Sequence, residues 1–179
     1  GDIGSALARQ LAPFGVRLIG VKRNADERLR ETLGLEWLGG VEDIKRLGME
    51  ADFIVVCATL NTSSERMIND EFFACTTDKK FLINIARGAI LDRLAVEKAL
   101  AEGRIGGIAT DTYWKEPADP NDPLLSHPRV YVTPHIAGVT DDAFQGTLRV
   151  VRENVERLAR GEQPVNCVNL EPRREGGET

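Results

Sequence analysis

Residues 52–58 read DFIVVCA and residues 81–85 read FLINI, two short apolar runs rich in β-branched side chains. Runs of this kind, without polar alternation, are typical of strands buried on both faces of a parallel sheet. Segments with helical spacing lie around them, so strands and helices alternate along the chain. Such alternation with short connections predicts a parallel sheet that is covered by helices on both faces.

Further strands and helices extend this alternation in both directions. Strands are predicted at residues 16–21 (VRLIGV), 105–110 (IGGIAT) and 130–133 (VYVT), with a polar loop at residues 116–128. The predicted helices are the apolar repeat Ile3–Phe14 that stops at Gly15, Glu42–Leu47, Asp70–Ala74 capped by Asn69, the segment from Asp92 to Gly103, and the long apolar stripe from Thr140 to Gly161.

The N-terminus reads Gly1-Asp2-Ile3-Gly4 and runs directly into a helix. This matches the second half of the G-x-G-x-x-G fingerprint, whose glycines let a pyrophosphate approach the backbone at a helix N-terminus. We therefore predict a Rossmann-type doubly wound parallel α/β sheet with its first strand missing. Gly1, Asp2 and Ile3 are predicted to contact a dinucleotide. By itself the motif also fits an ordinary helix entry that contains glycine.

The strand predicted at residues 16–21 ends in two cations, Lys22 and Arg23. NAD-preferring folds carry an acidic residue at this place, which binds the ribose hydroxyls, whereas here no carboxylate occurs before Asp26. Two cations could instead bind a 2′-phosphate. Lys22 and Arg23 are therefore predicted to contact the cofactor, with NADP(H) preferred and NAD(H) possible. The alternative is that both are solvated loop charges.

Three polar patches follow three successive predicted strands: NIARG at residues 84–88, DTYWKEP at 111–117 and TPHIAG at 133–138. Parallel α/β sheets bind ligands outside the carboxyl ends of their strands. We therefore expect one arginine, one glutamate and one histidine, Arg87, Glu116 and His135, to meet where a bound nicotinamide would end.

These patches give the chain a family likeness. It resembles the D-isomer-specific 2-hydroxyacid dehydrogenases, especially their phosphoglycerate dehydrogenase-like and glyoxylate or hydroxypyruvate reductase-like members. The resemblance covers roughly Gly1 to Asn169, with NIARGAILD, the D-x-Y-x-x-E-P run with DPNDPLL, and TPHIAG in the family's order. It implies an oxidoreductase that transfers hydride between NAD(P)H and a small 2-oxoacid or D-2-hydroxyacid, and a homodimer in the full-length form.

The resemblance also implies a role for each residue. Arg87 binds the substrate carboxylate and polarises its carbonyl, His135 is the general acid/base, and Glu116 orients and charges the imidazole. Asp111 lies near the nicotinamide carboxamide. The other predicted cofactor contacts, which also include Arg87 and His135, are Cys57, Ala58, Thr59, Ile85, Ala86, Ala137 and Gly138.

Other residues in these patches have plainer interpretations. Trp114 either shapes the substrate pocket or packs, and His127 is interpreted as a loop residue. Cys57 is interpreted as a small apolar strand residue and not as a reactive thiol.

Three segments are expected. Residues 1–138 form the cofactor-binding domain, residues 139–170 return toward a substrate-binding domain that this sequence does not contain, and residues 171–179 form a frayed tail. Because that substrate-binding domain supplies part of the family's active site, we predict that the isolated chain is unstable or inactive. Two other functions remain open. One is a non-catalytic dinucleotide-sensing module; the other is a formate or phosphite dehydrogenase, although formate dehydrogenases carry Gln where Glu116 stands.

Composition limits the partners. A formal net charge of −5 argues against nucleic acid. No apolar run approaches the about 20 residues that span a bilayer, so no membrane partner is expected. The three cysteines show no C-x-x-C spacing, which predicts reduced thiols, no metal site, and a cytoplasmic, plastid or other reducing compartment.

Overall fold

The computed structural model describes residues 1–167 and divides the chain into two units, with the boundary between Ile136 and Ala137. The second unit is built on one helix, α6 (Asp141–Ala159), which starts next to Thr140, close to the predicted start, and is capped by the Thr140 side chain. The tail expected at residues 171–179 lies outside the described residues.

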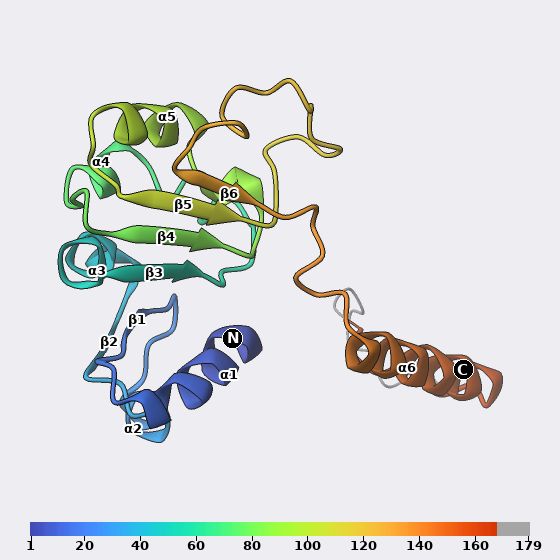
Figure 1. Ribbon diagram of the computed structural model, residues 1–179. Coiled ribbons are helices and arrows are strands. Elements are labelled where there is room, and N and C mark those ends of the chain that lie inside the picture. Colours follow the sequence, from blue (N-terminus) through green and yellow to red (C-terminus); the bar gives the residue numbers. More distant parts are fainter. Residues whose placement is uncertain (168–179) are drawn as a thin grey trace, which may run out of the picture. The chain divides into compact units, whose positions relative to one another are not determined.

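Six strands lie in the described part of the first unit, and every pairing between them is parallel. They form a two-stranded sheet, β1-β2, and a four-stranded sheet, β3-β4-β5-β6 (Figure 1). The strands are β1 (Ile19–Val21), β2 (Trp37–Gly39), β3 (Phe53–Val56), β4 (Phe81–Asn84), β5 (Gly107–Thr110) and β6 (Val130–Val132).

Helices lie between successive strands from β1 to β5, whereas a loop joins β5 to β6. The α-helices of the first unit are α1 (Asp2–Leu11), α2 (Glu27–Leu33), α3 (Ile44–Glu50), α4 (Asp70–Phe73) and α5 (Arg93–Ala101). Three 3₁₀ turns complete it, η1 (Ala12–Phe14), η2 (Val41–Asp43) and η3 (Gly88–Ile90). The prediction of parallel strands alternating with helices is confirmed.

Each sheet matches one part of the doubly wound strand order 3-2-1-4-5-6. The pair β2-β1 fits positions 3 and 2, and β3-β4-β5 fits positions 4, 5 and 6, with β6 beyond them. No described residue fills position 1. This order agrees with the expectation of a missing first strand, which stays a prediction.

The main core lies on one face of the four-stranded sheet. Leu82 of β4, Ile108 of β5 and Ile54 of β3 are at most 4% exposed and pack with apolar residues of α4 and α5. The other face of β3 and β4 carries Phe53 and Phe81, whose rings stack with centroids 5.6 Å apart. Phe53 is 67% exposed, so the prediction that both faces of this strand are buried is wrong.

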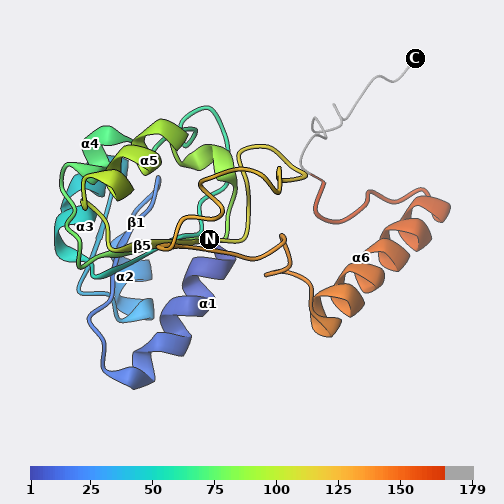
Figure 2. The same cartoon turned by 45° about the horizontal axis from the view of Figure 1, so that its top comes forward.

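A smaller core joins α1 and α2 to the two-stranded sheet. Its buried members are Ala8, Leu33 and Leu35. Both views show α1 and α2 apart from α4 and α5 (Figure 2). The sequence analysis missed α2 and β2.

Several predicted boundaries shift by a few residues. The strand expected at residues 16–21 begins only at Ile19, and the strand expected at 105–110 begins at Gly107. The helix expected over Ile3–Phe14 ends at Leu11 and continues as a 3₁₀ turn to Gly15, whose φ is +65°. The helix expected over residues 42–47 is η2 followed by α3.

Candidate active site

Three strand ends bring the predicted catalytic patches to one edge of the four-stranded sheet. In the sheet register Asn84 of β4 lies beside Thr110 of β5, and Thr110 lies beside Val132 of β6. Because the strands are parallel, the segments that follow them leave the sheet at the same edge. Arg87, Glu116 and His135 belong to these three segments.

Glu116 and His135 are in direct contact. His135 Nδ1 lies 2.8 Å from Glu116 Oε2, and the backbone N–H of Tyr113 donates to Glu116 Oε1 at 3.1 Å. A carboxylate can only accept, so the imidazole Nδ1 is the donor and Nε2 is left for a substrate. The Tyr113 N–H and then the imidazole lower the pKa of the Glu116 carboxyl below its usual range.

The backbone at His135 is held in an uncommon conformation. Its φ is +56°, in the left-handed region that side chains other than glycine rarely adopt. Such a residue costs about 1–3 kcal/mol and persists where its neighbours hold it, as at many functional sites. Here the His135 N–H donates to the Thr133 carbonyl at 2.9 Å, and the next N–H, of Ile136, donates to Asp111 Oδ1 at 2.9 Å.

Asp111 and Tyr113 join the ends of β5 and β6. Asp111 is 4% exposed, and its Oδ1 also accepts from the Thr133 hydroxyl at 2.5 Å. The Tyr113 hydroxyl donates to the Thr133 carbonyl at 2.8 Å. Hydrogen bonds from side chains therefore join the segments that carry Glu116 and His135, close to the points where these segments leave β5 and β6. Contact of Asp111 with a nicotinamide stays a prediction.

The Arg87 segment is shaped by a buried asparagine and a glycine. Asn84 is fully buried; its Nδ2 donates to the Arg87 carbonyl at 3.1 Å, and its Oδ1 accepts from the Ala86 N–H at 3.1 Å. At Gly88 an added Cβ would lie 2.1 Å from the carbonyl carbon of Tyr113. Only glycine lets this turn pack on the backbone of the segment that leads to Glu116.

Arg87 itself is exposed, and its Nη1 donates to the Ala86 carbonyl at 2.6 Å. Within residues 1–167 its guanidinium forms no salt bridge, yet its charge helps to lower the pKa of Glu116. Arg87 therefore lies near the Glu116–His135 pair with its charge available to an anion.

The nucleotide end of the site is built from the N-terminus of α1 and the end of β1. No described side chain caps α1 at Gly1, and an added Cβ on Gly1 would meet no described atom within 4 Å. An added Cβ on Gly4 would lie 3.8 Å from the Cβ of Cys57, so this N-terminus reaches the carboxyl end of β3. Uncapped N–H groups of a helix N-terminus suit a pyrophosphate, and these residues fit a dinucleotide.

The other predicted cofactor residues are spread around this edge. Cys57, Ala58 and Thr59 follow β3, and burial raises the pKa of the half-buried Cys57 thiol. Ile85 and Ala86 follow β4. Ala137 and Gly138 belong to the second unit, so the first unit does not include them. Asp2 and Ile3 lie exposed in the first turn of α1.

The two cations after β1, Lys22 and Arg23, pair with no carboxylate among the described residues. Arg23 is exposed, Lys22 is half-buried, and neither forms a salt bridge in the described part of the chain. The nearby carboxylate of Asp26 caps α2 by accepting from the Leu29 N–H at 2.7 Å. This carboxylate is therefore already used at the helix.

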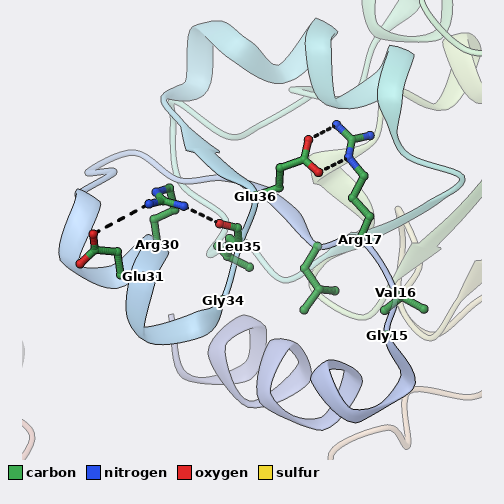
Figure 3. A pocket seen from close by; sticks show the side chains of 9 residues that line it. Gly15, Val16, Arg17, Arg30, Glu31, Gly34, Leu35 and Glu36 are labelled. Carbon is green, nitrogen blue, oxygen red and sulfur yellow. Dashed lines mark hydrogen bonds and ion pairs between the residues drawn. The ribbon is translucent and has the colours of Figure 1, made fainter.

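A pocket of about 570 Å³ is lined by residues 15–18, which precede β1, and by residues of α2 and the turn after it (Figure 3). No residue of the three catalytic patches lines it. Arg17 in its wall pairs with Glu36 and Glu50. Arg30 donates to the Leu35 carbonyl at 2.9 Å and pairs with glutamates of its own helix. Because the charged groups in its wall are paired with one another or with neighbours, we assign no site to this pocket.

No helix within residues 1–167 has the length and apolar character to span a bilayer. In the same residues no cluster of three or more His, Cys, Asp or Glu side chains could hold a metal ion.

The strand order, the glycine-led helix and the polar strand ends define a Rossmann-like dinucleotide-binding domain. Residues 1–137 match the family profile described as D-isomer specific 2-hydroxyacid dehydrogenase, NAD binding domain, and the chain belongs to this family.

Known relatives agree with this assignment. Glyoxylate reductase of Thermococcus kodakarensis is 36% identical over 171 residues, which cover 96% of this chain and 50% of that protein. D-3-phosphoglycerate dehydrogenase of Methanocaldococcus jannaschii is 32% identical over 95% of this chain and 32% of that protein. The chain thus spans half the length of the first of these relatives and less of the second.

A solved structure supports the fold. The D-isomer specific 2-hydroxyacid dehydrogenase from Xanthobacter autotrophicus Py2, in complex with NADPH and MES, is 29% identical with a TM-score of 0.79. The match covers 94% of this chain and 67% of that chain. With the family profile, this supports the coarse prediction of an NAD(P)-binding domain.

Sequence reasoning gave no role to the residues that hold the predicted catalytic groups in place. Asn84, Gly88, Tyr113 and Thr133 all stand inside the quoted patches, yet their contacts are between segments. A polar residue at the end of a buried strand, as Asn84 is, was the available signal.

Proposed function

We propose that this chain is the cofactor-binding and catalytic part of an oxidoreductase that transfers hydride between NAD(P)H and a small 2-oxoacid or D-2-hydroxyacid of the glyoxylate, hydroxypyruvate or phosphoglycerate type. The contact of 2.8 Å between Glu116 and His135, with the unpaired guanidinium of Arg87 nearby, carries this proposal. The names of the relatives support the substrate class.

In this proposal each side chain has one task. The bound nicotinamide supplies or takes up the hydride. Arg87 holds the carboxylate of the substrate and polarises the adjacent carbonyl. His135, held through Nδ1 by Glu116, presents Nε2 to the carbonyl oxygen and donates a proton in reduction or removes one in oxidation. Glu116 fixes the orientation of the imidazole by accepting the Nδ1–H hydrogen bond at 2.8 Å.

Replacing His135 by Gln in the full-length protein tests this role. We expect kcat to fall by about 10²–10⁴-fold, the usual contribution of a general acid/base, with cofactor affinity unchanged. The matched control is His127→Gln, since His127 lies in the loop before β6 and its imidazole Nδ1 accepts from the Arg129 N–H at 3.2 Å. A His135→Gln variant with the turnover of the wild type would refute the assignment.

We further infer a preference for NADP(H). Lys22 and Arg23 follow the strand whose end holds the ribose in this fold, and the first carboxylate after them, Asp26, is used as a helix cap. Replacing Lys22 or Arg23 by Ala should raise KM for NADPH about tenfold, because hydrogen bonds to charged groups are worth about 1.5–3 kcal/mol, and should leave KM for NADH unchanged. Arg28→Ala, an exposed charge on α2, is the control. A wild-type protein that prefers NADH contradicts the inference.

A homodimer and a reducing compartment complete the proposal. The exposed apolar side chains Phe53, Phe81 and Tyr131 of the larger sheet support a dimer of the full-length protein, which light scattering would test. The free Cys57, Cys75 and Cys167 support a reducing compartment such as the cytoplasm or a plastid, and cell fractionation would test it.

The alternative functions are weaker on the same observations. A non-catalytic dinucleotide-sensing module would not need a glutamate–histidine pair beside an unpaired arginine. A formate dehydrogenase would carry Gln in place of Glu116. Cofactor binding without turnover of any 2-oxoacid would favour the sensing module. The prediction that the 179 residues are unstable or inactive alone stays open to the same assay.

A further inference from the structure

The loop that carries Glu116 is long and lines a cavity. It joins β5 to β6 over residues 111–129, and a cavity of about 240 Å³ lies beside it, lined by Arg93, Trp114, Asp122 and Leu125 among others. A loop of this length needs contacts with rigid elements to hold a side chain in place. The segment 87–93, which begins with Arg87 and ends at the start of α5, supplies them.

Three contacts join this segment to the loop. Gly88 packs on the backbone of Tyr113 and Trp114. The Trp114 Nε1–H donates to the Leu91 carbonyl at 2.7 Å. At the far end Arg93 holds Asp122 with two parallel bonds, Nη1 to Oδ2 at 2.5 Å and Nη2 to Oδ1 at 2.6 Å.

The Arg93–Asp122 pair differs from the other ion pairs of residues 1–167. The Asp122 side chain is 16% exposed, the least of any paired carboxylate there. The guanidinium lies 5.5 Å from the centroid of the Trp114 ring and also pairs with Glu97 at 2.8 Å. A bidentate, partly buried arginine–carboxylate pair fixes distance and angle, which a single exposed pair does not.

We propose that Arg93 is a positioning residue: by clamping Asp122 it holds the 111–129 loop on the Arg87 segment and so keeps Glu116 in contact with His135. The proposal rests on the proposed function for its effect on turnover. Its structural part, the position of Glu116, can be measured without turnover.

The test compares variants of the full-length protein. Arg93→Met keeps an apolar chain on Trp114 and removes the clamp; Asp122→Asn keeps Oδ1, which also accepts from the Leu124 N–H at 3.0 Å, and removes the charge. Lys98→Met is the matched control. Lys98 lies on α5 as Arg93 does, and the pair that it forms with Asp70 of α4 is exposed. Arg93→Lys keeps the positive charge but cannot form the two parallel hydrogen bonds to Asp122.

Two readouts are taken, kcat with a 2-oxoacid and the pKa of Glu116 from carboxyl ¹³C NMR. We expect Arg93→Met to lower kcat roughly 10–100-fold, as small displacements of a reacting group do, while KM for the cofactor stays within about twofold. The pKa of Glu116 should rise toward its ordinary value. Arg93→Lys should be intermediate, Lys98→Met unchanged, and the Arg93→Met/Asp122→Asn double variant no worse than Arg93→Met.

The outcomes separate this proposal from the proposed function. If the wild-type protein reduces no 2-oxoacid but the pKa of Glu116 rises in Arg93→Met, the proposed function is refuted and the positioning role of Arg93 is supported. An unchanged Glu116 pKa in Arg93→Met overturns the clamp, whether or not the wild type turns over. An active wild type with an unchanged kcat in Arg93→Met also overturns it, and so does an equal loss in Lys98→Met.

Discussion

The four-stranded sheet and the two-stranded sheet of the first unit carry different parts of the candidate site on unequal cores. Sixteen buried apolar residues pack behind β3–β6, and only three pack behind β1–β2. The groups proposed for chemistry, Arg87, Glu116 and His135, follow strands of the larger sheet. The cations proposed for the ribose, Lys22 and Arg23, follow a strand of the smaller one.

This difference separates two tasks. Groups that act on a reacting atom need a fixed geometry, which a dense core and interlocked side chains supply. Groups that only bind the far end of a cofactor tolerate more motion, and a two-stranded sheet is marginal by itself. A bound cofactor stabilises whatever it contacts, so we expect the smaller sheet to depend more on cofactor than the larger one does.

The largest expected effect contrasts the two cores. Leu82→Ala empties a fully buried position of β4 and should lower the free energy of unfolding by about 3–5 kcal/mol. Leu35→Ala, in the smaller core at 7% exposure, should cost about 2 kcal/mol, because its sparser surroundings collapse more easily. Urea denaturation of the full-length protein measures both. Equal losses would erase the comparison.

The next effect contrasts two glycines. Gly88→Ala would put a Cβ 2.1 Å from backbone that cannot yield, so we expect a loss of about 1–3 kcal/mol and a lower kcat. Gly20→Ala in β1 would meet only the tips of two flexible side chains, Leu38 at 3.2 Å and Leu35 at 3.6 Å, and should change stability by less than about 1 kcal/mol. Thermal unfolding and steady-state kinetics decide it; a harmless Gly88→Ala would show that the two segments can move apart.

The smallest effect contrasts two carboxyls, Glu116 beside the larger sheet and Glu36 beside the smaller. Both have lowered pKa values, Glu116 first through the Tyr113 N–H and Glu36 first through the Arg17 guanidinium. Each therefore favours the folded state above its ordinary pKa near 4.5, and this contribution is lost as the pH falls through the lowered value.

Salt should separate the two carboxyls. At about 1 M salt the screening length is about 3 Å, so the exposed pair of Glu36 weakens and its pKa rises more than that of Glu116. Carboxyl ¹³C titrations at low and high salt measure both values. A larger rise at Glu116 would mean that charge, not the backbone bond, holds it.

The sequence predicted the site best where a local motif directly follows a strand of the parallel sheet. Arg87, Glu116 and His135 follow three strands, and parallel strands bring such residues to one edge without any knowledge of side-chain contacts. The helix cap Asn69 was also correctly predicted, because a cap bonds within its own turn.

Contacts between distant segments were beyond the sequence. Arg93 and Asp122 are 29 positions apart, and no spacing rule joins them. The exposure of Phe53 depends on what covers one face of the sheet, which an apolar run does not reveal. The helix α2 (ERLRETL) was missed because its only apolar residues are Leu29 and Leu33, which give too weak a helical pattern.

The close packing of Gly88 on Tyr113 has a practical consequence for engineering. A designer who grafts the loop 111–129 from a relative, to alter the proposed substrate preference, also inherits that loop's contact surface. Without the matching turn at residues 84–93, the new loop would meet a surface shaped for another backbone. The two segments should therefore be exchanged together, as one cassette.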